Sequence, residues 1–247
     1  GFAAETENLI DNAKEKLLGA RFNRIAPLTD TKILTSWNGL MLNSMALAGS
    51  ILGRNDYIAA AVKNATFLLE NLQVEERIFR SRNDGQSYGK GYLEDYAALA
   101  DGLIALYEAT LDTKWIKEAI SIANRMIELF WDGNLEQFFD TGTDHESLLA
   151  RPRDITDNAM PSGTSIAVDV LLRLATLTGN NQYLSKASLE LKSLQEFMGR
   201  VPIGFGHWLE SLDFHPSSPK EIALVGPRNS DSVQDMLRVI FNGYLPN

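Results

Sequence analysis

One spacing, repeated three times, constrains the fold of this 247-residue chain more than any other feature. In each of three helical stretches, a residue near the start stands 20 positions before an aromatic residue: Trp37 and Tyr57, Asp95 and Trp115, and Gly163 and Tyr183. A fixed spacing of this kind is typical of repeated helical hairpins. A single hairpin cannot bury its apolar stripe alone and needs similar hairpins beside it. The repeat therefore predicts stacked helical pairs, as in a repeat protein or an α/α toroid.

The two helices of each pair differ in charge. The stretch 38–52 contains no charged residue, 96–110 contains only Asp101 and Glu108, and 165–178 contains only Asp169 and Arg173. Helices that are apolar on almost every side are typical of buried positions. The helices that follow them carry their charges on one side, as solvent-facing helices do. We therefore expect an inner and an outer layer.

The length of the chain suits one substantial core, so we expect a single domain over residues 1–247. The helical hairpins are expected in 20–215 and a small strand-helix appendix in 216–247, with a strand at 221–225 and a helix at 231–241. An amphipathic helix over 5–19, ended by Gly19, is predicted ahead of the hairpins. The connections 73–92 and 131–160 are longer than the ~12 to 15 residues of a plain loop, which predicts hairpins or functional excursions.

Composition excludes several classes of partner. The net charge is −9 and no cluster of Lys and Arg stands out, so nucleic acid is not expected to bind. The absence of cysteine excludes disulfides and thiolate zinc sites, and a cytoplasmic location is the default expectation. The longest charge-free stretch, 33–53, contains polar residues and predicts a buried helix, so we expect no membrane partner. No metal-binding or phosphate-loop pattern is present, so neither a metal nor a cofactor is expected.

Four motifs carry a family resemblance: DTKILTSWNGL at 30–40, GYLEDY at 91–96, LYEAT at 106–110 and PSGTS at 161–165. Together they resemble the C-terminal part of the spermatogenesis-associated protein 20 family, over roughly residues 23–247. The resemblance implies a six-hairpin (α/α) toroid that follows a thioredoxin-like domain. That domain and the early hairpins are not in this sequence, which begins at Gly1 and is expected to be a fragment. The fold class we expect is therefore all-α, an incomplete (α/α)6 toroid of the six-hairpin glycosidase type.

The resemblance also implies where a site would lie. The six-hairpin class includes glycosidases, lyases and sugar epimerases, whose sites lie around a central funnel where the inner helices begin. For catalysis, the residues at or near these starts are Glu94, Asp95 and His207. For substrate binding, the expected residues are Asp30, Lys32, Trp37, Asn38, Asp157, Ser162 and Trp208.

These residue types suit carbohydrate chemistry. Sugar rings stack on tryptophan, and carboxylates and amides form hydrogen bonds with hydroxyl groups. Two carboxyl groups about 5 to 9.5 Å apart would supply an acid and a base or nucleophile. His207 lies between Gly206 and Trp208 and close to Glu210, where it could serve as a general base near neutral pH.

Each residue also has a purely structural interpretation. Negative charge in the first turn of a helix stabilises it by ~0.3 to 1 kcal/mol, which accounts for Glu94 and Asp95 without a substrate. Adjacent side chains point about 100° apart on a helix, so at most one of the two faces the funnel. Trp37 could be a core residue, Asn38 and Lys32 could satisfy buried carbonyls, and Ser162 is expected to cap the helix that it opens. No Gly-x-Ser-x-Gly elbow is present, which argues against a serine hydrolase.

Two functions remain open at this point. One is a carbohydrate-active or carbohydrate-binding domain, glycosidase-like or epimerase-like. The other is a non-catalytic scaffold that binds the absent thioredoxin-like domain or another partner. An incomplete ring also exposes an apolar flank, so we expect self-association through the open edge.

Overall fold

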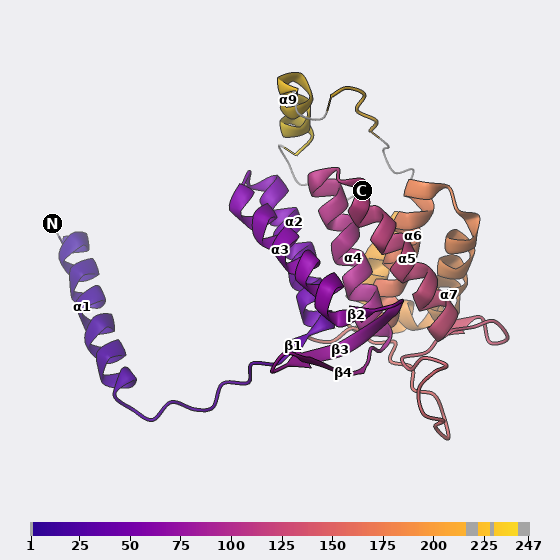
Figure 1. Ribbon diagram of the computed structural model, residues 1–247, viewed down its shortest axis with the longest axis horizontal. Helices are drawn as coiled ribbons and strands as arrows, with labels where there is room; N and C mark the ends of the chain where they lie inside the picture. The colour runs from indigo at the N-terminus through magenta and orange to yellow at the C-terminus, as the bar shows by residue number, and fades with distance from the viewer. Residues whose placement is uncertain (1, 216–221, 228–229, 242–247) are drawn as a thin grey trace. The chain divides into compact units, whose positions relative to one another are not determined.

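A computed structural model describes residues 2–215, 222–227 and 230–241 of the chain, which is predominantly helical (Figure 1). Contacts divide the chain into two compact units, residues 1–31 and 32–247. The first unit contains helix α1 (Phe2–Phe22), which is longer than the predicted helix over 5–19. Gly19 lies inside α1 and does not end it, because a glycine within a helix costs only ~1 kcal/mol and nothing there imposes a turn.

The second unit contains the three predicted hairpins. They are α2 (Thr35–Ile51) with α3 (Asn55–Leu72), α4 (Leu93–Thr110) with α5 (Thr113–Phe130), and α6 (Gly163–Thr178) with α7 (Asn181–Arg200). Next come a short 3-10 turn (Pro202–Gly204) and α8 (Gly206–Phe214). The inner helices α2, α4, α6 and α8 pack side by side in that order, and α3, α5 and α7 each cover their own inner partner (Figure 1). The predicted two layers are confirmed.

The repeated spacing marks how each hairpin closes. After each of the first three inner helices the chain passes through a left-handed residue: Gly53, Leu111 and Gly179. The next helix then begins, and the recurring aromatic residue lies in its first turn. Trp115 and Tyr183 are buried there, whereas Tyr57 is half-buried. The aromatic residue therefore anchors the outer helix at a fixed distance from the inner one.

Helix α4 forms the centre of the core, and its approach to α2 depends on glycine. A Cβ on Gly39 would lie 2.5 Å from the carbonyl carbon of Ala98, and a Cβ on Gly102 would lie 2.7 Å from the carbonyl oxygen of Gly39. No real Cβ atom tolerates such distances to a backbone. The two inner helices are thus packed backbone against backbone, which brings their first turns close together.

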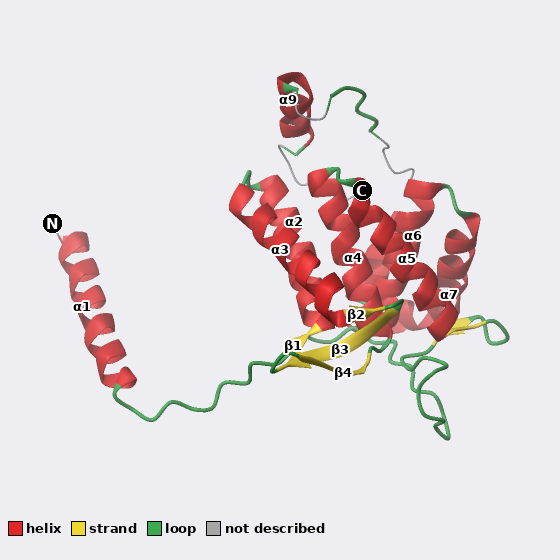
Figure 2. Ribbon diagram, in the orientation of Figure 1, coloured by secondary structure: helices red, strands yellow, loops and turns green. Residues whose placement is uncertain are grey.

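Both long connections contain short antiparallel strands, as Figure 2 shows. In the first sheet β3 (Arg77–Asn83) is central and pairs with β1 (Ile33–Leu34), β2 (Gln73–Val74) and β4 (Gln86–Lys90). A second pair joins β5 (Trp131–Asp132) to β6 (Gln137–Phe138). Because β1 runs directly into α2, the first sheet lies at the end of the layer where α2 begins. The predicted hairpins in 73–92 and 131–160 are confirmed.

The C-terminal appendix is only partly as predicted. Helix α9 (Asp231–Ile240) is present, and Ser230 caps it by accepting from Val233 N. The described residues 222–225 do not form the predicted strand, and Glu221 lies outside the described residues. An isolated strand has no partner for its backbone groups, so apolar β-branched residues alone do not create one. None of the described helices has the length and apolar character needed to span a bilayer.

Candidate functional site

The first turns of α2 and α4 are held together by one buried carboxylate. Ser36 N donates to Asp95 Oδ1 at 3.1 Å, and Tyr92 N donates to Asp95 Oδ2 at 2.9 Å. Arg80 Nη1 lies 3.3 Å from the same Oδ2. Burial raises the pKa of Asp95 to about 6, although these donors act in the opposite direction.

A second carboxylate does the same for α6 and α8. Asp157 Oδ1 accepts from Ser162 N at 2.9 Å and from Ser165 Oγ at 2.8 Å. Asp157 Oδ2 accepts from His207 N at 2.9 Å, with Trp208 N at 3.4 Å. Asp157 therefore has a structural role instead of the predicted contact with a substrate. Both of its carboxylate oxygens accept hydrogen bonds from residues at the starts of α6 and α8.

The starts of α4 and α6 touch directly. A Cβ on Gly163 would lie 2.9 Å from Glu94 N and 3.2 Å from Glu94 Cβ, so only glycine fits between these two turns. The first turns of α2, α4, α6 and α8 are thus linked in succession. We call these four first turns the rim.

Of the two acidic residues at the start of α4, only Glu94 is accessible. The side chain of Asp95 is fully buried, whereas that of Glu94 is 34% exposed. The prediction that at most one of the two faces outward agrees with this geometry. The catalytic role considered for Asp95 is corrected to a capping role, since no atom of its carboxyl group is left to touch a substrate.

Arg80 orients Glu94 and was not identified from the sequence. Its Nη1 donates to Glu94 Oε1 at 2.6 Å, and its guanidinium lies 4.8 Å above the ring of Tyr92. Arg80 reaches the rim from β3, within the first long connection. The length of that connection was the only sequence signal that pointed to a function for it.

Asp140 is a second carboxyl group beside Glu94 and was also missed. Its carbonyl accepts from Leu93 N at 3.0 Å, at the start of α4, and its Oδ2 accepts from Asp154 N at 2.8 Å. Burial raises the pKa of Asp140 to about 6, and the carboxylates of Asp154 and Glu94 act in the same direction. A carboxyl group with a pKa near 6 is suited to donate a proton close to neutral pH.

Trp37 lies in the first turn of α2 with 58% of its surface exposed, so it is not a core residue. Its neighbour Asn38 serves the backbone, because its Nδ2 donates to Leu34 O at 2.8 Å. Lys32 is exposed and lies just before β1. Asp30 belongs to the first compact unit, residues 1–31. Substrate contacts by Lys32 and Asp30 stay predictions.

The remaining predicted residues have different environments. Ser162 Oγ accepts from Ser165 N at 3.1 Å, which confirms the predicted cap. Trp208 is fully buried and its Nε1 donates to Ile155 O at 2.9 Å, so the predicted contact with a substrate is corrected to a core position. His207 Nδ1 lies 3.0 Å from Glu210 Oε2. Its Nε2 is buried and has no hydrogen-bond partner in the part of the chain that the structure describes.

The few charges of the inner helices form one network farther along α4 and α6. Arg173 pairs with Asp101 at 2.6 Å, with Glu108 at 2.8 Å and with Asp169 at 3.7 Å. Asn43 Nδ2, from α2, donates to Asp101 Oδ2 at 2.6 Å. Burial raises the pKa of Asp101, whereas Arg173 and His207 lower it. This network explains how apolar helices carry isolated charges.

The described residues contain no group of His, Cys, Asp or Glu arranged to bind a metal ion.

Comparison with curated proteins gives relatives along almost the entire chain. Spermatogenesis-associated protein 20 of Homo sapiens is 30% identical over 250 residues, which cover 97% of this chain and 32% of that protein. The Rattus norvegicus protein of the same name is 32% identical over 253 residues, with the same coverage. An uncharacterised protein of Caenorhabditis elegans is 29% identical over 252 residues. The chain spans about a third of the length of the curated relatives it matches. No family profile matches it.

Solved structures share the fold. A GH76 α-mannanase from Bacteroides thetaiotaomicron superposes with a TM-score of 0.60 at 15% identity, over 88% of this chain and 58% of that one. A cellobiose 2-epimerase from Bacillus thermoamylovorans gives 0.56 at 11% identity, over 66% and 44% of the two chains. At these identities the likeness shows the fold alone. The predicted six-hairpin toroid, with part of the ring in this chain, is confirmed.

Proposed function

Because the chain is homologous over nearly its whole length to a part of spermatogenesis-associated protein 20, and because it has the six-hairpin toroid fold, we propose that its rim binds carbohydrate and performs acid-base chemistry on it. One observation supports this proposal most directly. Glu94 and Asp140, two neighbouring carboxyl groups in different environments, lie at the same set of helix starts as the exposed indole of Trp37.

The two carboxyl groups would have different roles. Glu94 accepts a hydrogen bond from Arg80 and is exposed enough to reach a substrate or a water molecule. Asp140, with its pKa raised to about 6 by burial, retains a proton over part of the range near neutral pH. A buried carboxyl group with a raised pKa beside an accessible carboxyl group that is paired with a cation is typical of a catalytic acid next to a base or nucleophile. Hydrolysis of a glycosidic bond uses that combination.

An epimerase-like reaction would use His207 instead. Its Nε2 has no partner among the described residues, and Glu210 beside Nδ1 would fix the tautomer in which Nε2 can accept a proton, provided that substrate binding gives access to this buried atom. The two reaction classes differ in which variant abolishes turnover. Loss of activity in Glu94→Gln and Asp140→Asn favours hydrolysis, and loss in His207→Ala alone favours epimerisation.

Binding is tested by ligand-dependent unfolding with a panel that includes mannose, mannobiose and cellobiose. A sugar at 100 times its Kd adds ~2.7 kcal/mol to the free energy of unfolding. Trp37→Ala and Glu94→Gln are expected to remove this gain. Glu128→Gln is a matched control, because Glu128 also accepts a 2.6 Å bond from an arginine, Arg125, on the outer helix α5. Unchanged melting curves across the panel, or equal losses in Glu94→Gln and Glu128→Gln, would count against the proposal.

A second candidate function, the interaction scaffold, is supported by the exposed apolar stripe of α2. Trp37, Met41 and Leu47 are all exposed on this inner helix, whereas α4 and α6 have inner neighbours on both sides. The proposed partners of this stripe are a helical hairpin, a thioredoxin-like domain or a second copy of the chain. Met41→Lys should weaken association measured by light scattering and leave sugar binding intact. A wild-type protein that stays monomeric at high concentration and does not bind the thioredoxin-like domain would contradict this role.

A further inference from the structure

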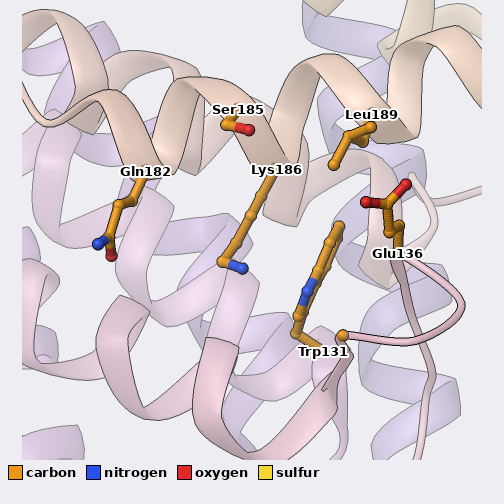
Figure 3. A pocket seen from close by; sticks show the side chains of 7 residues that line it. Trp131, Glu136, Gln182, Ser185, Lys186 and Leu189 are labelled. Carbon is orange, nitrogen blue, oxygen red and sulfur yellow. The ribbon is translucent and has the colours of Figure 1, made fainter.

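A groove on the outer layer lies apart from the rim. It is formed between the β5–β6 hairpin and the first three turns of α7, and its volume is about 300 Å³ (Figure 3). The hairpin contributes Trp131 and Glu136, and the helix contributes Gln182, Ser185, Lys186 and Leu189. The helix residues lie three or four positions apart and therefore share one face of α7.

The hairpin is fixed to α7 at its base, which leaves the groove open beside its turn. Phe138 N donates to the buried Glu190 Oε1 at 2.5 Å, and the ring of Trp131 packs edge-on against that of Phe138 at 5.0 Å. In the turn, Asp132 Oδ1 accepts from two backbone amides, and Glu136 has a left-handed φ of 53°. The position of the indole is thus set by packing and not by a ligand.

Among the residues that the structure describes, the polar side chains of the groove form no hydrogen bond or ion pair with the protein, although Lys186 makes a cation–π contact with Trp131. Lys186 Nζ lies 4.5 Å from the centroid of the Trp131 ring and forms no ion pair with a described residue. Burial lowers the pKa of Lys186. Within the described ranges, the side chains of Glu136, Gln182 and Ser185 also make no hydrogen bond. By contrast, Glu190 on the same helix is paired with Arg153 at 2.5 Å.

We propose that this groove is a carbohydrate-binding site distinct from the rim, with room for one or two sugar rings. A hydroxyl group both donates and accepts, so a sugar beside the indole of Trp131 can accept from Lys186 and form both kinds of bond with Gln182 on one side of the ring, or donate to Glu136 on the other (Figure 3). The C–H face of a pyranose matches the apolar surface of Trp131 and Leu189. A simple anion would face Glu136, and a simple cation would face Lys186. The volume lies at the lower end for small-molecule pockets, which sets the size of the ligand.

Sugar binding in the groove can be tested without any reaction at the rim. The test is an NMR titration of the 15N-labelled chain with methyl glycosides of glucose, mannose and galactose, followed at the Trp131 indole and at the amides of residues 182–189. Glycine and inorganic phosphate are titrated separately. We expect saturable shifts with at least one glycoside, and a Kd weakened about tenfold in Lys186→Met and in Gln182→Ala. Trp131→Phe tests the indole while an aromatic ring still packs against Phe138.

Two control variants show whether the sugar binds in this groove. Lys192→Met removes an exposed lysine of the same helix and should leave the Kd unchanged. Glu94→Gln should also leave it unchanged, so failure of the rim and failure of the groove are distinguishable. The absence of saturable shifts with every glycoside would overturn the proposal. Saturation by glycine or phosphate without any sugar, or full affinity in Lys186→Met, would overturn it as well.

Discussion

Replacing Asp157 by alanine should detach the start of α8 from that of α6. The carboxylate accepts from three donors at 2.8 to 2.9 Å, Ser162 N, Ser165 Oγ and His207 N. Each hydrogen bond to a charged group contributes about 1.5 to 3 kcal/mol, and water replaces part of this in a site that is not fully buried. We therefore expect the free energy of unfolding to fall by about 3 to 5 kcal/mol. For a chain of this size the melting temperature should drop by about 6 to 20 °C.

Urea unfolding measures this effect, and the slope m shows its extent. If α8 separates before the remaining helices unfold, m should fall and amide exchange should accelerate in 206–214 ahead of α4. Asp154→Ala is the matched control, because among the described residues the Asp154 carboxylate accepts only from Thr156, in an exposed turn. That control should lose less than about 1 kcal/mol. A loss of the same small size in Asp157→Ala, with unchanged m and exchange, would refute the structural role.

Contacts elsewhere in the helical layers lead to three more predictions. Gly163→Ala should destabilise the chain by about 1 to 3 kcal/mol, because the new Cβ would clash with the backbone of Glu94. Gly199→Ala, where a Cβ would have no atom within 4 Å, should be neutral or slightly stabilising. Equal effects of the two substitutions in thermal unfolding would contradict the close approach of α4 and α6. Arg173→Met should lower the free energy of unfolding by about 3 to 5 kcal/mol, since it leaves buried Asp101 without its cation. In urea unfolding, the double variant with Asp101→Asn should recover part of that loss. No recovery would show that the two residues are not coupled. Burial raises the pKa of Asp140 from 3.8 to about 6, so the ionised carboxylate destabilises the folded state at neutral pH. This destabilisation disappears as the pH falls towards 4, because the folded state binds the proton before the unfolded state does. Relative to Asp140→Asn, the wild type should gain about 1 to 2 kcal/mol between pH 7 and 4, after allowance for partial exposure; a constant difference would argue against the raised pKa.

The sequence predicts the architecture well because local signals repeat. The 20-residue phase places an aromatic residue in the first turn of each outer helix, and the scarcity of charge identifies the inner layer. The cap formed by Ser162 follows from its position before an apolar run. Gly19 and residues 222–225 show the limit of such signals, since neither a glycine nor a short apolar run determines structure without tertiary contacts.

The site is predicted less completely because its residues come together over long range. Arg80 and Asp140 reach the rim through β3 and through the connection after β6, and no local spacing relates them to Glu94. Whether Trp37 or Trp208 is exposed depends on which neighbours pack against each helix. The sequence identifies both as aromatic residues near helix starts, but only the three-dimensional contacts separate an exposed indole from a buried one.

Binding of a sugar at the rim, against Trp37 and beside Glu94 and Asp140, is the property on which the proposed function depends. An NMR titration of the 15N-labelled chain with neutral disaccharides and trisaccharides tests it most directly. We expect saturable shifts at the Trp37 indole and at the amides around residues 94 and 140, which are lost in Trp37→Ala. Saturable shifts that avoid these three positions, or no shift with any saccharide, would contradict it.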